Sequence, residues 1–217
     1  AVEQKLQEAI SYRDNADLYH VARAQNYLVE AIRLSREPKP DVQRISSLLG
    51  QAINEARRAT DLSPRSGAIW ENLATMYENA AVLVPDARDW AMQSLAQAKT
   101  LEPTNPVLAW RLGNNYSLAG NWPEAIKSYQ EAIGLKKDHI GAYVGLANAY
   151  EQTKEMDKAI AIYAGIAPLA QDDIDFLFNF GRLLYNRNGK GDRGDAEKLW
   201  REVVRRHPAT EEERRAR

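Results

Sequence analysis

One glycine-rich segment near the carboxyl end of the chain has the spacing of two known binding loops. Residues 189–194 read Gly-Lys-Gly-Asp-Arg-Gly, which matches the Gly-x-Gly-x-x-Gly pattern of dinucleotide-binding loops. Such a loop follows a strand, whereas the residues before Gly189 have the pattern of a helix. As a calcium loop starting at Asn186, the segment would place Lys190 where an oxygen ligand is needed. We therefore predict a polar turn that binds neither a cofactor nor a metal.

Residue types that often carry catalysis are present but are not grouped. The three histidines, His20, His139 and His207, are far apart, and none lies beside a nucleophile or an acid–base pattern. The chain has no Gly-x-Ser-x-Gly, no His-Glu-x-x-His and no phosphate-binding loop. It has no cysteine, which excludes disulfides and thiolate metal sites. The sequence thus predicts a protein that is not an enzyme, and His139 and His207 are expected to cap helices or lie on the surface.

The composition narrows the classes of partner. Charged residues make up 27% of the 217 residues, yet the formal net charge is only -1. Nucleic-acid-binding proteins usually carry a basic excess, so we expect no nucleic-acid partner. No apolar run is long enough to span a bilayer, so we expect no membrane contact from this segment itself. Residues 1–12 read as a helix with no cap before them, and Thr210 and Glu213 form a capping box close to the end. We therefore expect a piece of a longer protein.

A repeated pattern dominates the chain. Six positions in its middle carry small, apolar and aromatic residues: Leu112, Gly113, Tyr116, Ala125, Tyr129 and Ala132. A step of 34 residues leads to a matching set: Leu146, Ala147, Tyr150, Ala159, Tyr163 and Ile166. A period of this length, with helix-like spacing inside it, indicates stacked pairs of helices. Each pair buries its apolar face only against its neighbours, so the product is a solenoid.

Residues that typically begin or end helices divide this array into units. Asn105 and Pro106 open a helix that Gly120 ends, and Asn121 with Pro123 opens the next helix. Two units carry insertions in the turn between their helices, one of them around residues 81–86. We predict a single array made of a partial repeat helix (1–14), an expanded repeat (15–66), a repeat with an insert (67–105), two regular repeats (106–139 and 140–173), a second repeat with an insert (174–208) and the start of a further helix (209–217).

The pattern resembles the tetratricopeptide repeat. That family has Trp-x-x-Leu-Gly-x-x-Tyr in the first helix, which is similar to Trp70-x-x-Leu73-Ala74-x-x-Tyr77 and to Leu112-Gly113-x-x-Tyr116 here. The helix openings at 123–126 and 158–160 also match, and the resemblance is strongest over 67–170. It implies an all-α, right-handed α-solenoid of antiparallel helix pairs. It also implies a scaffold that binds a protein or peptide in its concave groove.

A narrower resemblance concerns the order of the segments. The series Leu-Ser-Pro, Ile-Trp-Glu-Asn-Leu, Ala-Arg-Asp-Trp-Ala and Leu-Glu-Pro-Thr-Asn-Pro is similar to soluble regions of bacterial multi-spanning membrane proteins, some of them like O-antigen ligases. This resemblance implies an extracytoplasmic domain attached to a membrane-spanning region. In that case the array could serve as a structural spacer or assembly domain of an envelope protein, with no ligand in its groove.

The family resemblance also implies which residues line the groove. At its groove positions this chain carries six residues that we single out as a peptide-binding strip: Trp110, Asn114, Val144, Asn148, Phe178 and Arg182. An Asn amide can donate to and accept from a peptide backbone. Trp110 and Phe178 would hold side chains, unless Trp110 packs on the neighbouring helix, and Arg182 would meet an acidic group. No lysine occupies the fifth groove positions, so we do not expect the carboxylate clamp of the chaperone-binding members.

Overall fold

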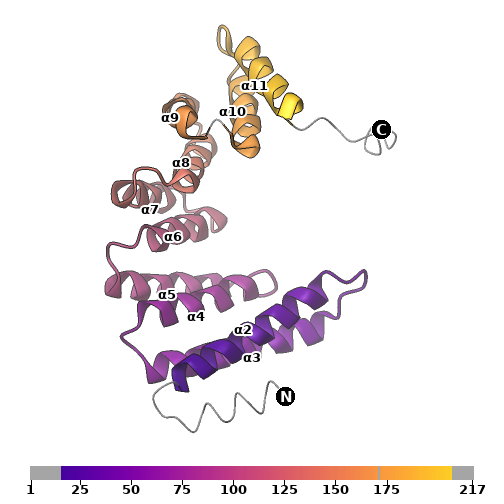
Figure 1. The fold of residues 1–217 in the computed structure, drawn as a ribbon, viewed down its shortest axis with the longest axis vertical. Helices are drawn as coiled ribbons and strands as arrows, with labels where there is room; N and C mark the ends of the chain where they lie inside the picture. Colours follow the sequence, from indigo (N-terminus) through magenta and orange to yellow (C-terminus); the bar gives the residue numbers. More distant parts are fainter. Residues whose placement is uncertain (1–15, 171, 207–217) are drawn as a thin grey trace. The chain divides into compact units, whose positions relative to one another are not determined.

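The computed structural model describes residues 16–170 and 172–206 (Figure 1). These residues form ten α-helices and no strand, so the predicted all-α class is confirmed. The helices are α2 (Ala16–Ser35), α3 (Val42–Leu62), α4 (Gly67–Ala80), α5 (Ala87–Leu101), α6 (Pro106–Leu118), α7 (Trp122–Leu135), α8 (Ile140–Gln152), α9 (Met156–Ala170), α10 (Ile174–Arg187) and α11 (Asp192–Arg206). We call the first helix of each successive pair helix A (α2, α4, α6, α8 and α10) and the second helix B.

The chain falls into two compact units, which we describe separately. Unit 1 comprises residues 1–115 and unit 2 comprises residues 116–217, so the division lies inside α6. The segments predicted at 1–14 and 209–217, with His207 and the capping box at Thr210, lie outside the described residues. Within the described ranges, no helix is both long enough and apolar enough to cross a bilayer.

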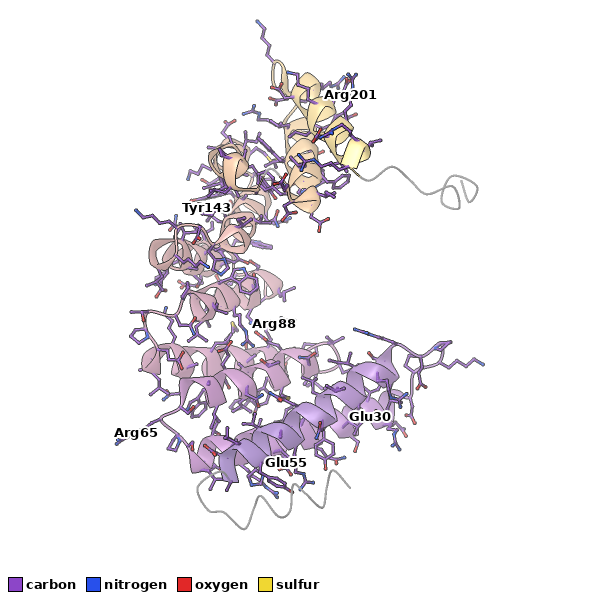
Figure 2. The ribbon with its side chains drawn as sticks, in the orientation of Figure 1. Glu30, Glu55, Arg65, Arg88, Tyr143 and Arg201 are labelled. Carbon is purple, nitrogen blue, oxygen red and sulfur yellow. The ribbon has the colours of Figure 1, made fainter. Side chains whose placement is uncertain are left out.

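In unit 1, the long helices α2 and α3 pack against each other, and α3 packs against α4. The α3 helix begins after Asp41, whose carboxylate accepts a hydrogen bond from the Arg44 amide at 3.0 Å. Small and aliphatic side chains fill the interior, and Ala24 and Ala52 are fully buried. One polar contact joins the pair: His20 Nδ1 lies 2.6 Å from Oε2 of the buried Glu55, which is labelled in Figure 2. No local pattern around His20 indicates this partner, which lies 35 residues later in the chain.

The α4–α5 pair carries the predicted insertion as a loop at residues 81–86. The backbone first continues as tight turns, because the Ala81 amide donates to the Tyr77 carbonyl and the Val84 amide to the Ala80 carbonyl. Ala81 is buried, but the next three side chains point outward: Val82, Leu83 and Val84 are 82%, 40% and 51% exposed. The insertion therefore adds an exposed apolar loop to unit 1.

In unit 2, the turns between helices use the predicted signals. Gly120 has a φ of +73°, a left-handed conformation that glycine adopts without strain, and it follows the end of α6. Asn121 then caps α7 by accepting from the Glu124 amide. His139 caps α8 in the same way, because its Nδ1 accepts from the Ala142 amide at 3.2 Å. The capping role predicted for His139 is confirmed.

Aromatic residues of the B helices fill the gaps between pairs in unit 2. Tyr129 lies against Gly145 of the next pair, where an added Cβ would come within 2.5 Å of the tyrosine ring. Tyr163 stacks on Phe180 with ring centroids 5.5 Å apart. Trp200 has the matching position in α11, the helix B of the last pair. It packs instead against Gly181 of α10, the helix A of its own pair. Glycine at these positions is required by the close approach of a ring.

The glycine-rich segment after α10 is a capped turn. Asn188 is left-handed with a φ of 55°, and Asp192 accepts hydrogen bonds from the Gly189 amide and from the Arg187 guanidinium. A helix precedes the segment, as expected, so the context of a dinucleotide-binding loop is missing. Asp192 is buried, and the ion pair with Arg187 holds the pKa of its carboxyl below the ordinary value. Over the described ranges, no cluster of three or more His, Asp or Glu side chains is arranged to hold a metal ion.

Candidate binding surface

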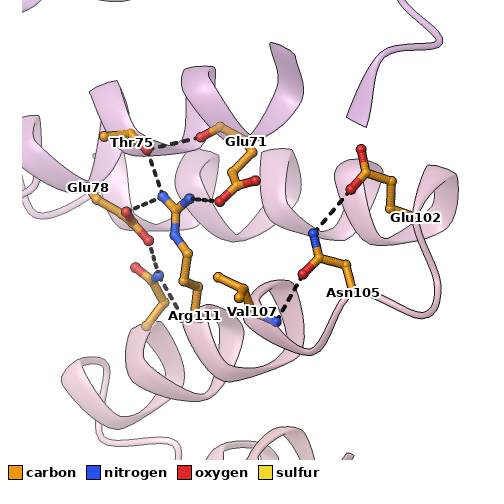
Figure 3. Close-up of polar contacts among 8 residues, drawn as sticks. Glu71, Thr75, Glu78, Glu102, Asn105, Val107 and Arg111 are labelled. Atoms are coloured by element: carbon orange, nitrogen blue, oxygen red, sulfur yellow. Dashed lines mark hydrogen bonds and ion pairs between the residues drawn. The ribbon is translucent and has the colours of Figure 1, made fainter. Parts of the chain in front are cut away.

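In unit 1, the helix-A face is organised around one arginine of α6 (Figure 3). Arg111 reaches across to α4, where it donates to Glu71 Oε1 at 2.9 Å and to Thr75 Oγ1 at 2.8 Å. It also donates to Glu78, whose other carboxylate oxygen accepts from Asn115 at 2.7 Å. Glu71, Thr75 and Glu78 all lie on α4, the preceding helix A, and each of them accepts a hydrogen bond from Arg111.

The two predicted strip residues of unit 1 also lie on α6. Trp110 and Asn114 are both partly buried, and both have contacts within the molecule. Trp110 is thus intermediate between the two alternatives that the sequence left open, an exposed anchor and a packed side chain. The α6 helix itself is fixed at its start, because Asn105 accepts from the Val107 amide at 3.1 Å and donates to Glu102 (Figure 3).

In unit 2, the helix-A face contains a second arginine held by a carboxylate. Arg182 of α10 donates two hydrogen bonds to Glu151 of α8, at 2.7 and 2.8 Å. The paired geometry favours the charged state of both groups, so it lowers the pKa of Glu151 and raises the pKa of Arg182. The acidic group that the sequence predicted for Arg182 in a ligand is therefore supplied by the chain itself.

An exposed aromatic cluster lies on α10 and α11. Phe178 and Tyr185 are seven residues apart on one face of α10, and they are 51% and 50% exposed. Trp200 supports both rings, with centroid distances of 6.5 Å to Phe178 and 5.7 Å to Tyr185. The indole nitrogen of Trp200 donates to the Phe178 carbonyl at 3.3 Å. The rings are therefore held in place while each keeps a free surface.

The remaining strip residues lie on α8. Asn148 is exposed, one turn before Glu151, whereas Val144 is partly buried and packs against the core of unit 2. Figure 2 labels the neighbouring Tyr143, which also packs against that core. Of the six strip residues, four belong to unit 2, where the Arg182–Glu151 ion pair links the helices that carry them. Trp110 and Asn114 belong to unit 1, and the continuity of all six as one strip stays a prediction.

A cavity that the sequence did not point to lies in unit 1. It has a volume of about 670 Å³, and its lining includes the aromatic side chains of Trp70, Tyr77 and Trp90. The sequence patterns identify Trp70 and Tyr77 only as repeat residues, and Trp90 only as part of the Ala-Arg-Asp-Trp-Ala segment. A signal was present, however: Trp90 directly precedes Ala91, as Glu124 and Lys158 precede the matching alanines at 125 and 159. A tryptophan where the two regular repeats carry a charge indicates an exposed aromatic surface.

Known proteins share both sequence and fold with the chain. Residues 117–177 match the family model described as tetratricopeptide repeat. Tetratricopeptide repeat protein 13 of Homo sapiens is 28% identical over 142 residues, which cover 61% of this chain and 16% of that protein. Stress-induced-phosphoprotein 1 of Caenorhabditis elegans is 24% identical over 156 residues, covering 69% of this chain and 48% of that protein. The chain thus spans less than half of the length of either relative.

Solved structures with this arrangement of helices include several bacterial proteins. The crystal structure of MamA has a TM-score of 0.63 at 22% identity and covers 77% of this chain and 94% of its own. Pseudomonas aeruginosa pilF has a TM-score of 0.65 at 16% identity, covering 89% and 77%. YrrB, described as a TPR protein with an unusual peptide-binding site, has a TM-score of 0.59 at 17% identity, covering 94% and 92%. At these identities the likeness shows a common fold. The sequence match identifies residues 117–177 as tetratricopeptide repeat, and the structural likeness shows that the chain shares the fold of such proteins.

Proposed function

We propose that the chain is a non-catalytic protein-interaction scaffold that binds an extended peptide on the helix-A face of unit 2. Tetratricopeptide repeats serve generally as protein-interaction scaffolds, which supports the class of function. The observation that carries the site is the pair of half-exposed rings, Phe178 and Tyr185, held in place by Trp200. Buried aromatic anchors dominate the energy of most protein interfaces, and these two rings present large free surfaces.

The polar groups beside the rings suit a peptide backbone. Asn148 is exposed on α8, and its amide can donate to one backbone carbonyl while accepting from one backbone amide. Arg182 stands one turn after Phe178, and its two bonds to Glu151 leave further N–H donors on the guanidinium. A segment lying across α8 and α10 would therefore find backbone partners from Asn148 and side-chain contacts from Phe178 and Tyr185. Val144 would contribute apolar contact at the edge.

The proposal keeps Trp110 and Asn114 of unit 1 as predicted peptide contacts, because of their phase in the repeat. Asn114 has the same phase in its repeat as Asn148 has in the next, 34 residues later. The solved structure of YrrB is described as having a peptide-binding site, which supports peptide ligands for proteins of this fold.

A second candidate function is a structural spacer or assembly domain with no groove ligand. Internal pairing of charged groups supports this alternative, because Arg111 and Arg182 are both neutralised by carboxylates of the preceding helix A. A face whose charges are satisfied within the chain has no electrostatic need for a partner. The alternative does not account for the exposure of Phe178 and Tyr185, and so we rank it second.

A peptide library displayed on phage tests the proposal. The parent protein is used to select peptides, and the affinity of the best peptide is then measured for three variants by isothermal titration. We expect Phe178→Ala to weaken binding about 30-fold, the loss typical of a hot-spot aromatic. We expect Asn148→Ala to weaken it about fivefold, because one or two backbone hydrogen bonds are lost.

Trp90→Ala is the matched control, since Trp90 is 54% exposed but belongs to unit 1. It should leave the affinity of the selected peptide unchanged. If no peptide is selected, or if Phe178→Ala binds as tightly as the parent, the helix-A face of unit 2 is not the binding site and the spacer function is preferred.

A further inference from the structure

The insertion between α4 and α5 forms an apolar ridge at one end of unit 1, which we define as residues 82–84. Val82 is 82% exposed, and Leu83 and Val84 are 40% and 51% exposed. The Leu83 and Val84 amides both donate to the Ala80 carbonyl, so tight turns hold the backbone of the ridge. In Figure 1 the loop lies at the same end of the unit 1 helices as the turn between α2 and α3. Exposed apolar side chains that cluster in this way mark a surface for association.

A hollow lies directly beside the apolar ridge, between the ridge and the α2–α3 turn. It has a volume of about 300 Å³, and its lining includes Val42, Leu49 and Val82. We call it the turn-side hollow. An apolar cavity of about 150 Å³ already accepts benzene, so the turn-side hollow has room for a branched aliphatic side chain. A second hollow of about 280 Å³ lies on the other flank of the ridge, next to Val84 and Trp90.

The lining of the turn-side hollow favours an apolar occupant. Its two polar side chains already use their donors inside the chain: the Ser35 hydroxyl donates to the Ile32 carbonyl and the Asn79 amide to the Thr75 carbonyl, each at 2.8 Å. Every other side chain that lines the hollow is apolar. An aliphatic occupant would therefore leave no donor of the wall unsatisfied. A charged occupant would lose its hydration without gaining a partner.

A protruding ridge beside a hollow makes this surface complementary to itself. In a dimer with two-fold symmetry the same surface of both chains meets, so each feature faces its neighbour across the axis. An axis between the apolar ridge and the turn-side hollow would place Val82 of each chain in the hollow of the other. A partner that filled only the hollow would leave Val82 in water. A second copy of the chain covers both features at once.

The charged residues at the two edges of this surface favour the same arrangement. Residues 36–44, which include the α2–α3 turn, contain three basic and two acidic side chains. Residues 86–89, where α5 begins, contain two acidic side chains and one basic side chain. The edge beside the turn-side hollow is therefore net positive, and the edge beyond the ridge is net negative. The two-fold axis described above brings the positive edge of one chain to the negative edge of the other, which is electrostatically favourable.

From these observations we propose that unit 1 is a self-association surface, through which two copies of the chain form a two-fold dimer. The apolar ridge of each chain packs into the turn-side hollow of the other, with Val82 as the inserted side chain and Val42 on the wall that receives it. This surface lies on other helices than the peptide site proposed in unit 2, and it adds dimerisation to the binding function.

Sedimentation equilibrium of the whole chain over the micromolar range tests the proposal. The parent protein should show a reversible monomer–dimer equilibrium. Val82→Asp and Val42→Asp should each raise the dissociation constant at least about tenfold, because each places a charge in an apolar contact. Val82 and Val42 are 82% and 57% exposed in the single chain, so both variants should fold, and circular dichroism checks this. Leu169→Asp is the matched control: Leu169 is 59% exposed on α9, outside the apolar ridge and outside the proposed peptide strip, and the variant should dimerise like the parent.

Cross-linking tests the arrangement of the two chains, because the parent contains no cysteine and single cysteines can be introduced. A mixture of Val82→Cys chains and tagged Val42→Cys chains should be joined by a short bismaleimide, whereas Val82→Cys mixed with tagged Leu169→Cys should not. The proposal is overturned if the parent is a monomer throughout, if folded Val82→Asp dimerises like the parent, or if the Val82→Cys and Val42→Cys chains are not joined. It is also overturned if the parent stays monomeric and cosediments with phosphatidylcholine vesicles through Val82.

Discussion

Tyr77 of unit 1 and Tyr150 of unit 2 stand at the same phase of the repeat, yet their surroundings are opposite in kind. Tyr150 is covered by two polar side chains, Gln130 and Lys158, which bond to its hydroxyl and lie over its ring. Tyr77 stacks on the exposed Trp90 and lines two cavities. The insertion at 81–86 precedes α5, the helix that carries Trp90, and unit 2 has no insertion between α8 and α9.

This contrast shows which positions make one repeat differ from another within the same fold. The residues that define the repeat face other helices and vary little between units. The residues just outside that set decide whether a junction is closed, as at Lys158, or open, as at Trp90. The side chain just before the repeat alanine, Trp90 before Ala91 or Lys158 before Ala159, therefore determines the surface at that junction.

The units differ in a second way, in how one helix A is tied to the next. In unit 1, Arg111 is largely buried with 14% of its side chain exposed, and it bridges two carboxylates. In unit 2, Arg182 is 37% exposed and contacts the single carboxylate of Glu151. Because desolvated charges lose more when a partner is removed, the Arg111 cluster should contribute more to stability than the Arg182 pair.

The largest effect that we expect comes from testing this difference directly. Arg111→Ala should lower the free energy of unfolding by about 2–3 kcal/mol, because it leaves Glu71 and Glu78 facing each other without a cation. Arg182→Ala should cost about 1 kcal/mol, since water can replace part of the lost contact. Urea unfolding followed by circular dichroism measures both. Arg33→Ala, at a site that is 59% exposed, is the control and should change stability by less than about 0.5 kcal/mol. Equal losses at Arg111 and Arg182 would contradict the comparison.

A pair of glycine substitutions tests the filled and open junctions. Gly145→Ala in unit 2 should destabilise by about 1–2 kcal/mol, because the new Cβ would lie 2.5 Å from the Tyr129 ring. Gly50→Ala in unit 1 should instead stabilise by about 0.5–1 kcal/mol, since no atom lies within 4 Å of the added Cβ in the middle of α3. Thermal unfolding of both variants should shift in opposite directions. A shift of the same sign in both would mean that the junctions are equally packed.

The smallest effect concerns the pH dependence of the unit 2 ion pair. The pKa of Glu151 is lowered in the folded protein by the two hydrogen bonds from Arg182. A lowered folded-state pKa stabilises the protein above the pKa of the unfolded chain, and that stabilisation is lost as the pH falls through the folded value. Glu151→Gln should therefore be less stable than the parent at pH 7, by about 1 kcal/mol or less, and the two should converge as the pH falls through the folded-state pKa of Glu151.

The background variant Arg182→Ala provides the control for this measurement. In that background, Glu151→Gln should cause a smaller pH-dependent difference, because Arg182, the main cause of the lowered pKa, has been removed, while Asn186 and Lys154 remain. A difference as large as in the parent background would assign the effect to those other groups near Glu151.

Some features were accessible from the sequence because they depend on neighbours along the chain. The spacing of Ala125, Tyr129 and Ala132 specifies which face of a helix is buried, and a helix repeats its faces within a few residues. Caps are equally local: Asn121 and His139 bond to amides three residues ahead. Such signals predicted the all-α class and the helix ends.

The candidate sites depended on contacts that no local pattern encodes. Arg182 was expected to be available to a ligand, but its carboxylate partner lies 31 residues earlier in the chain, and Arg111 finds its partners 33 to 40 residues away. The repeat positions of Trp90 and Phe178 indicate exposed side chains, but only packing determines that about half of each residue faces solvent. The helical period along one segment thus determines the buried face of each helix. The pairing of charges and the exposure of rings were decided by which helices the tertiary structure places side by side, because both depend on distances through space.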